Sequence, residues 1–191
     1  MQQARQEAVH AWYLATHDDT TGLPNRRALL AHLHTLLRTG QRVGLVLLDL
    51  DDFKTVNDRH GHEAGNDLLT EVGHRLVALG GPVVLAARLS GDEYALLVTG
   101  NLDQVAAAAH TAWQAVTASP VDIGAGPIPV GVSVGYTCAT PGVTVRSLLN
   151  AADQAMYHAK TTGSGVCGHP VAHASGPPPR IRHRDIRHHT T

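Results

Sequence analysis

The stretch ARLSGDEYALLV, residues 87–98, sets two apolar runs on either side of the polar tetrapeptide SGDE. Short apolar runs joined by a glycine-containing turn are typical of a β-hairpin, so the stretch predicts strands over 83–89 and 94–99. The turn then presents Asp92 and Glu93, two adjacent carboxylates that repel each other. A Gly-Asp-Glu turn standing alone is most often a solvated turn, because glycine and aspartate are turn formers. Whether this turn has a function therefore depends on which other residues lie beside it in the fold.

A second acidic segment ends the run RVGLVLLDL, residues 42–50, which is continuously apolar and predicts a buried central strand. If this strand and the hairpin are neighbours in one sheet, Asp49 and Asp92 meet at its edge. Carboxylates gathered in this way need a positive charge between them. Mg²⁺ suits such a site because it takes hard oxygen ligands and shares them with substrate phosphates. Gly91 allows backbone to come close there.

The rest of the chain alternates helical periodicity with short apolar runs. This alternation, with a hairpin in the middle, indicates an α/β domain with a mixed central sheet. Residues 51–66 are polar and are predicted to be irregular, and the chain from Val166 onward is predicted to be a disordered tail. Helices are predicted over 3–16, 25–38, 64–79, 101–116 and 144–163, and a further strand over 128–139.

Composition narrows the class of protein. The chain has 191 residues, 43% of them hydrophobic, and a formal net charge of −1, which gives no support to nucleic-acid binding through bulk charge. No apolar run approaches the ~20 residues that span a bilayer, and no signal peptide is visible. Its two cysteines lack metal or redox spacing. We therefore expect a reduced, cytoplasmic protein without a membrane or nucleic-acid partner.

Five segments resemble the GGDEF domain, the diguanylate cyclase family, in their order and spacing. The resemblance covers about 17–165 and implies a fold like the palm of nucleotidyl cyclases and polymerases: a mixed central sheet flanked by helices, with the signature motif on a hairpin. Residues 1–16 are then a helix for linkage or dimerisation, and 166–191 the tail. The matching segments are DDTTGLPNRRAL (18–29), LLDLDDFKTVNDRHGHEAGN (47–66), ARLSGDEYALL (87–97), VSVGYT (132–137) and AADQAMYHAKTTG (151–163).

The resemblance also implies an activity, the condensation of two GTP molecules into cyclic di-GMP and pyrophosphate with Mg²⁺, or Mn²⁺ in its place. Family members hold one GTP per half-site, so a homodimer belongs to the mechanism. Each implied residue also has a plainer reading, as a solvated surface residue or a loop-stabilising one. The implied roles are metal binding by Asp49, Asp92 and the Leu50 carbonyl, phosphate contact by Lys54 and Lys160, guanine or substrate contact by Asn57, His62, Asn66, Ser90 and Gly91, and proton removal from the attacking hydroxyl by Asp92 or Glu93.

The chain departs from the family pattern at several positions. The signature reads Ser90-Gly-Asp-Glu-Tyr94, and the tyrosine is a mild change if its hydroxyl finds water. Asn66 replaces an aspartate that accepts guanine hydrogen bonds, which predicts relaxed base choice. Ser164 stands where the family has a phosphate-contacting arginine. The inhibitory product motif is replaced by GPVV, residues 81–84, so we expect no product inhibition through that site.

Two functions stay open at this level. The first is a slow diguanylate cyclase, and the second is a catalytically impaired domain that senses GTP or another nucleotide. The Trp12 face of the N-terminal helix either pairs two copies or packs against its own domain.

Overall fold

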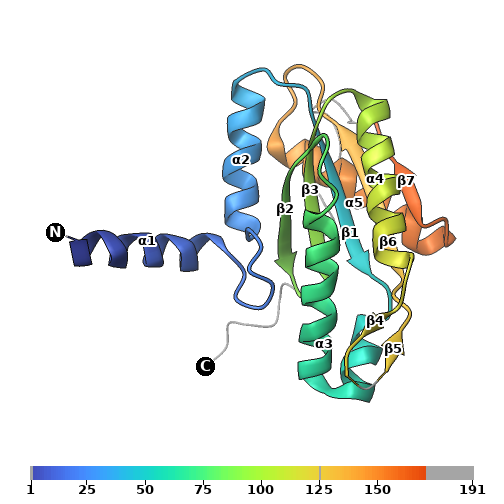
Figure 1. The fold of residues 1–191 in the computed structure, drawn as a ribbon. Coiled ribbons are helices and arrows are strands. Elements are labelled where there is room, and N and C mark those ends of the chain that lie inside the picture. Colours follow the sequence, from blue (N-terminus) through green and yellow to red (C-terminus); the bar gives the residue numbers. More distant parts are fainter. Residues whose placement is uncertain (1, 125, 171–191) are drawn as a thin grey trace, which may run out of the picture.

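The computed structural model describes residues 2–124 and 126–170, with side chains from Arg5 onward. Its body is a five-stranded sheet in the order β2-β3-β1-β6-β7, antiparallel except for the parallel pair β6–β7 (Figure 1). The predicted mixed sheet is therefore confirmed. The strands are β1 Val43–Leu50, β2 Val83–Ser90, β3 Glu93–Thr99, β6 Val132–Cys138 and β7 Val166–Gly168, and β4 Val121–Asp122 pairs with β5 Pro127–Ile128 in a small separate hairpin.

Helices cover both faces of this sheet and form a three-layer domain (Figure 1). One layer packs α3 and α4 against one face, and the other packs α2 and α5 against the opposite face. The helices are α1 Gln2–Thr16, α2 Arg26–Arg38, α3 Phe53–Val77, α4 Leu102–Thr117 and α5 Val145–Thr162.

The central strand β1 is buried along its whole length, as its apolar run predicts. Successive side chains of a strand point to opposite faces, and β1 follows this period. Val46 and Leu48 join the core under α3 and α4, whereas Leu45 and Leu47 join the core under α2 and α5. By the same alternation Asp49 lies on the α2/α5 face. The alternation of side chains along β1 thus determines the face of the sheet on which the Asp49 carboxylate lies.

The structure differs from the sequence prediction most in residues 51–66. This segment was expected to be irregular, but Phe53 begins α3, which runs on to Val77. Its first part is polar because most of it faces solvent, with Phe53 and Val56 packing partly against the core. Gly61 interrupts the helix with φ 86° and ψ 166°, so two helical stretches meet there at a kink. A short apolar stripe followed by a break leaves too little periodicity for sequence to reveal a helix.

Two further boundaries move. The strand predicted over 128–139 is divided into β5 and β6, with Pro129, which has no N–H to donate, between them. The first residues of the predicted tail form β7, and the Gly165 carbonyl just before it accepts from Val134 N at 2.8 Å. Residues 171–191 of that tail lie outside the described residues.

Helix α1 extends away from the domain (Figure 1). Trp12 is 62% exposed, and Val9 and Tyr13 are exposed beside it on the same face of the helix. Of the two readings of the Trp12 face, packing against its own domain is therefore not what the structure shows. Among the described residues, no helix combines the length and the hydropathy needed to cross a bilayer.

Candidate active site

The end of β1 and the acidic turn lie side by side. Strand pairing sets Asp49 opposite Glu93 on β3 and opposite Ser133 on β6. One residue further along, Leu50 N donates to the Asp92 carbonyl at 3.1 Å. Two segments more than forty residues apart in sequence thus bring Asp49 and Asp92 to the same end of the sheet.

Lys160, in the last turn of α5, makes an ion pair with Asp49. The Asp49 side chain is 3% exposed and that of Lys160 is 47% exposed, so the ammonium group reaches inward from the surface to neutralise a buried carboxylate. A buried carboxylate is costly without such a partner. The sequence predicted that Lys160 contacts phosphate. In the structure, which contains no nucleotide, Lys160 instead pairs with Asp49, the predicted metal ligand.

The signature turn has two residues between the paired Ser90 and Glu93. Gly91 takes φ 50°, in the left-handed region that favours glycine. A Cβ built at Gly91 meets no other atom of the chain within 4 Å. The positive φ therefore favours glycine at this position, whereas steric contact with the rest of the chain does not require it. Ser90 Oγ donates to Glu93 Oε2 at 3.3 Å, which gives the serine of the divergent signature a partner inside its own turn.

Tyr94, the other divergent signature residue, is fully buried under α3. Its hydroxyl donates to the Leu69 carbonyl at 2.7 Å, so the partner is a helix carbonyl and not the water that the sequence interpretation required. Burial raises the pKa of this phenol far above its usual range. Tyr94 therefore stays neutral and ties the signature strand to α3.

The kink at Gly61 brings Asn57 against the second half of α3. Residues 57 and 65 would be about 12 Å apart along a straight helix. Instead, a Cβ built on Gly65 would lie 2.0 Å from Asn57 Oδ1. Only glycine at position 65 leaves room for the Asn57 side chain. The structure thus places Asn57, the predicted guanine-contacting residue, against the second half of α3 at Gly65.

Other predicted residues lie on the surface. Lys54 pairs with Asp58 at 2.7 Å, with the two side chains 83% and 62% exposed, as expected for a solvated helix pair. His62 and Asn66 are exposed. Ser164 stands in the place of the family arginine, and its Oγ accepts a hydrogen bond from Thr162 Oγ1 at 3.0 Å. A serine hydroxyl is neutral and does not replace the charge of that arginine.

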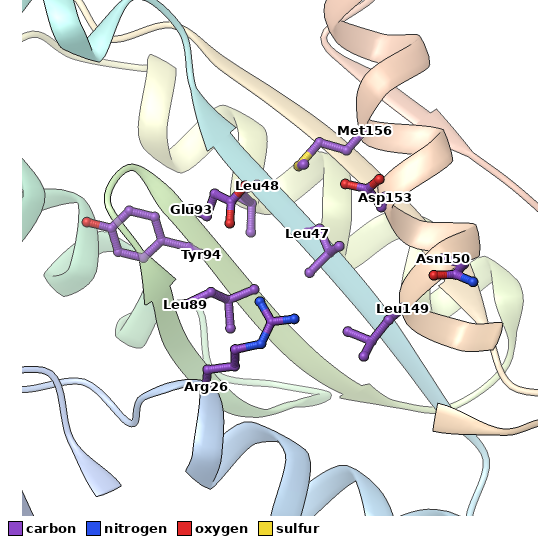
Figure 2. A pocket seen from close by; sticks show the side chains of 10 residues that line it. All are labelled: Arg26, Leu47, Leu48, Leu89, Glu93, Tyr94, Leu149, Asn150, Asp153 and Met156. Carbon is purple, nitrogen blue, oxygen red and sulfur yellow. The ribbon is translucent and has the colours of Figure 1, made fainter. Parts of the chain in front are cut away.

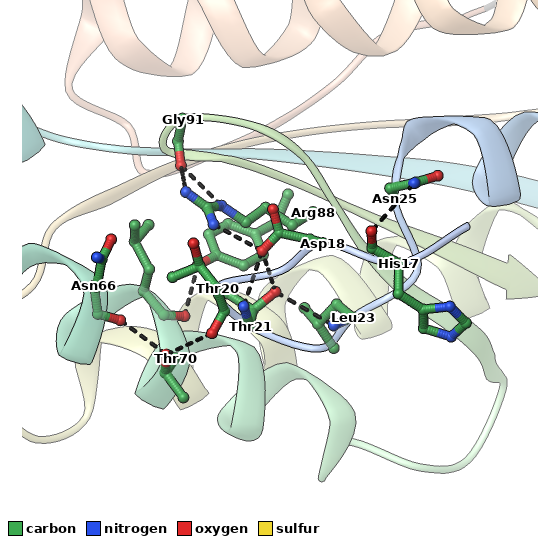
Figure 3. A network of polar contacts seen from close by, with 12 residues as sticks. His17, Asp18, Thr20, Thr21, Leu23, Asn25, Asn66, Thr70, Arg88 and Gly91 are labelled. Atoms are coloured by element: carbon green, nitrogen blue, oxygen red, sulfur yellow. Dashed lines mark hydrogen bonds and ion pairs between the residues drawn. The ribbon is translucent and has the colours of Figure 1, made fainter. Parts of the chain in front are cut away.

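Several residues near the acids carried no functional prediction. Asp51 Oδ1 accepts from Ser133 Oγ at 2.9 Å, and burial raises the pKa of Asp51 despite this bond and the nearby Lys160 charge. Arg88 is 9% exposed and bonds to the Gly91 carbonyl and to Asp18 (Figure 3). The sequence analysis missed Arg88, and the signal that could have revealed it is a charged residue within a largely apolar strand.

A cavity of about 150 Å³ lies on the α2/α5 face beside Glu93. Figure 2 shows Arg26 reaching over the sheet from the start of α2, while Asn150 and Asp153 line the side formed by α5. Leu47 and Met156 are among its apolar walls. Glu93 therefore borders both the edge with Asp49 and this cavity, and polar groups from two helices accompany it.

The donor set suits Mg²⁺ by its chemistry. Carboxylates of Asp49 and Asp92 and the carbonyl of Leu50 are hard oxygen donors at adjacent positions of the sheet edge. Within the described residues, no group of three or more His, Cys, Asp or Glu side chains is arranged to hold a metal ion. A magnesium ion held here would thus have few protein ligands and would complete its shell with water and phosphate oxygens, which is its usual habit.

Comparison with known proteins identifies the family. The family model "Diguanylate cyclase, GGDEF domain" matches residues 15–165, and the chain belongs to this family. The bifunctional diguanylate cyclase/cyclic di-GMP phosphodiesterase MucR of Pseudomonas aeruginosa is 36% identical over 160 residues, which are 81% of this chain and 23% of MucR. The diguanylate cyclase VdcA of Vibrio cholerae is 32% identical over 153 residues, 78% of this chain and 45% of VdcA. The chain thus spans less than half the length of these curated relatives.

Solved structures agree with this assignment. The diguanylate cyclase SiaD of Pseudomonas aeruginosa, solved with its activator SiaC, superposes with a TM-score of 0.74 at 32% identity, covering 85% of this chain and 64% of SiaD. The coiled coil and GGDEF domain of DgcB from Caulobacter crescentus, solved with c-di-GMP, gives a TM-score of 0.79 at 25% identity, covering 88% of this chain and 92% of that one.

Proposed function

We propose that this chain is a diguanylate cyclase that condenses two GTP molecules into cyclic di-GMP and two pyrophosphates. The observation that carries the proposal is the pairing of Asp49 with Glu93 across β1 and β3, with Asp92 bonded to Leu50 beside them. Family membership supplies the reaction class, and relatives named as diguanylate cyclases support it. Asp49 is buried at the end of a rigid central strand, so its position is fixed before substrate arrives.

Each residue has a defined task in this proposal. Asp49, Asp92 and the Leu50 carbonyl would hold Mg²⁺, which supplies charge neutralisation at the triphosphate and a lower pKa for the attacking hydroxyl. Glu93 or Asp92 accepts the proton of the 3′-hydroxyl as the new P–O bond forms and pyrophosphate leaves. Lys160 moves from Asp49 to the phosphates once another cation neutralises that carboxylate.

Substrate recognition is assigned to α3. Asn57, held against Gly65, hydrogen-bonds the base, and His62 and Asn66 contact the substrate from the exposed face of the kink. Lys54 releases Asp58 to steady the triphosphate. Ser90 and Gly91 line the turn next to the α-phosphate. An amide at position 66 offers one acceptor where a carboxylate offers two, which weakens guanine selection.

Catalysis in this proposal takes two copies of the chain. Each domain provides one nucleotide, and the 3′-hydroxyl of one attacks the α-phosphate of the other, so facing domains convert a rare encounter into a local one. The exposed Val9, Trp12 and Tyr13 side chains, at positions i, i+3 and i+4 of α1, provide an apolar face that a second copy of the same helix fits. A chain beginning at His17 is expected to associate less in sedimentation, and unchanged association would remove α1 from the dimer interface.

The direct test is incubation with GTP and Mg²⁺, followed by chromatography for cyclic di-GMP and an assay for pyrophosphate. The expected result is slow formation of both, abolished in Asp92→Asn, which keeps the shape of the turn. Tight GTP binding without pyrophosphate would instead favour a nucleotide sensor, the reading that Asn66 and the uncharged Ser164 support. Parallel incubations with ATP and with GTP–ATP mixtures measure base choice, and a guanine-only product at ordinary affinity would contradict relaxed selection.

Product inhibition gives an independent test of residues 81–84, a turn that leads into the start of β2. Gly81, Pro82, Val83 and Val84 have no ionisable side chain, so this segment offers no charge to a bound cyclic dinucleotide. We expect the rate to stay constant as cyclic di-GMP is added at concentrations well above that of the enzyme. Noncompetitive inhibition under these conditions would show that the product binds elsewhere.

A further inference from the structure

Arg88 joins the signature turn to a loop 70 residues earlier in the chain. Its side chain is 9% exposed, although it lies in β2 near the site. Nε and Nη2 donate to the Gly91 carbonyl at 3.0 and 2.8 Å, and Nη1 donates to Asp18 Oδ1 at 2.7 Å (Figure 3). The planar fork of a guanidinium suits such simultaneous contacts, and burial makes them expensive to lose.

The Gly91 carbonyl matters because it belongs to the peptide that leads into Asp92. A peptide unit is planar, so two donors on its oxygen fix the orientation of the whole plane. The next plane, from Asp92 to Glu93, is held by the bond from Leu50 N to the Asp92 carbonyl at 3.1 Å. Both peptide planes that flank Asp92 are therefore held, one by Arg88 and one by β1. Together they set the direction in which the Asp92 side chain leaves the backbone.

The Asp18 end of this connection is equally constrained. Asp18 Oδ1 also accepts from Thr21 N at 2.9 Å and from Thr21 Oγ1 at 2.8 Å. Its backbone N donates to the Leu23 carbonyl at 2.8 Å. Leu23 is buried and packs close to Gly73 of α3. The carboxylate therefore has a fixed position to which Arg88 is bound.

The loop over 17–25 is in turn bonded to α1. Asn25 Nδ2 donates to the carbonyls of Ala15 and His17 at 3.1 and 3.3 Å, and Asn25 N donates to the Thr16 carbonyl at 2.8 Å. The same asparagine caps α2, because its Oδ1 accepts from Ala28 N at 3.2 Å. An uninterrupted series of bonds thus leads from the last turn of α1 through Asp18 and Arg88 to Gly91.

We propose that Arg88 and Asp18 are positioning residues that hold Asp92 in its reactive direction, and that the loop over 17–25 passes the position of α1 to the signature turn. The kinetic consequence rests on the proposed cyclase function, whereas the structural coupling does not. A movement of α1, such as the pairing of two copies would produce, then alters the acid turn through bonds that already exist.

The first experiment compares Arg88→Lys with Arg75→Lys in the full chain. Arg75 is a matched control because it is also poorly exposed, at 14%, pairs with Glu71 and donates to the carbonyls of Val116 and Ser119, away from the signature turn. Lysine keeps the charge in each case and loses the fork. Both variants are therefore expected to lose stability. A loss of rate that occurs in Arg88→Lys alone can then be assigned to the position of Asp92 and not to lower stability.

Arg88→Lys is expected to lower kcat at least about tenfold with KM for GTP within about threefold, because small misplacement of a reacting group lowers rate more than binding. Arg75→Lys is expected to keep kcat within about twofold. The amides of residues 89–93 should exchange hydrogen faster in Arg88→Lys than in the unaltered chain. In Arg75→Lys their exchange rate should equal that of the unaltered chain. Equal kcat losses in the two variants, or unaltered exchange over 89–93, would overturn the positioning role.

The outcomes separate this proposal from the proposed function. If the unaltered chain forms no pyrophosphate, the cyclase proposal fails, and exchange over 89–93 still decides the coupling. Should Arg88→Lys not fold, Asp18→Asn, which leaves the bonds from Arg88 to Gly91 intact, is expected to give a smaller change in the same direction. No change over 89–93 in that variant would likewise refute the coupling.

Asn25→Asp tests the link to α1. Aspartate still caps α2, since its oxygen accepts as the amide oxygen does, but it turns the donors facing the Ala15 and His17 carbonyls into acceptors. Exchange is expected to rise over 15–18 and, through Asp18, over 89–93. A rise confined to 15–18 would show that α1 and the signature turn move independently.

Discussion

Replacing Lys160 by methionine is expected to destabilise the metal-free protein and to strengthen its binding of Mg²⁺. The lysine neutralises Asp49, whose side chain is 3% exposed, and methionine keeps the length of the side chain without its charge. Removing one partner of a fully buried pair costs about 3–5 kcal/mol. Lys160 is 47% exposed, however, so solvent screens part of the interaction and about 1–2 kcal/mol is expected.

This free energy translates into a measurable shift. For a domain of this size each kcal/mol lowers Tm by about 2–4 °C, so Lys160→Met should melt about 2–8 °C lower in EDTA. The ammonium group no longer competes for Asp49, and the same 1–2 kcal/mol corresponds to Mg²⁺ binding tighter by about 5–30-fold. Mg²⁺ should therefore raise Tm more in the variant than in the unaltered chain.

Thermal melts in EDTA and in a series of MgCl₂ concentrations, without nucleotide, measure both effects, and calorimetric titration gives the affinity directly. Lys54→Met is the matched control, because its ammonium is 83% exposed and pairs only with a surface aspartate among the described contacts. That variant should change neither Tm in EDTA nor the response to Mg²⁺. An unaltered Tm in EDTA for Lys160→Met, or weaker Mg²⁺ binding, would refute the idea that Lys160 and the metal share Asp49.

Three further predictions concern single contacts. Tyr94→Phe restores the family signature yet should lower stability by about 1 kcal/mol, because the bond to the buried Leu69 carbonyl is lost, and urea unfolding measures this. Gly65→Ala should weaken GTP binding in calorimetry while the domain stays folded, since the added methyl displaces Asn57, and unchanged affinity would argue against a base contact there. Burial favours a raised pKa for Asp18, but the hydrogen bonds from Arg88 and Thr21 and the Arg88 charge together hold this pKa below its ordinary 3.8. The contribution of Asp18 to stability is therefore present above pH 3.8 and lost as pH falls through the folded-state pKa. The difference in unfolding free energy between the unaltered chain and Asp18→Asn should therefore be constant from pH 5 to 7 by urea titration, within about 0.5 kcal/mol, and shrink below about pH 4.

Contacts of Ser90, Tyr94 and Arg88 explain how the divergent signature keeps its geometry. Ser90 bonds to Glu93 within the turn, Tyr94 bonds to the Leu69 carbonyl of α3, and Arg88 donates to the Gly91 carbonyl of the turn. The two divergent signature side chains, Ser90 and Tyr94, thus have partners of their own in this fold. The departures at Asn66 and Ser164 affect base choice and phosphate contact in the proposed reaction, where these residues offer weaker partners.

Much of the architecture was predictable from local pattern. Apolar runs identified the buried β1 and the hairpin of β2 and β3, and helical periodicity identified α1, α2, α4 and α5 within a residue or two. The start of α3 was missed because its first two turns bury little apolar surface, and an apolar stripe of only Phe53 and Val56 gives too weak a periodic signal. The short β7 was missed because three residues between a glycine and a polar segment carry too little pattern.

The sequence by itself determined which acids are available, that Asp49 ends a buried strand, and that a glycine turn carries Asp92 and Glu93. These properties follow from composition and period along a single segment, which are local. Only the tertiary structure decided that Lys160 neutralises Asp49 and that Arg88 holds the Gly91 carbonyl from Asp18. Such contacts join residues separated by many positions, and they depend on strand order, a helix kink and side-chain direction, which arise only when the layers pack together.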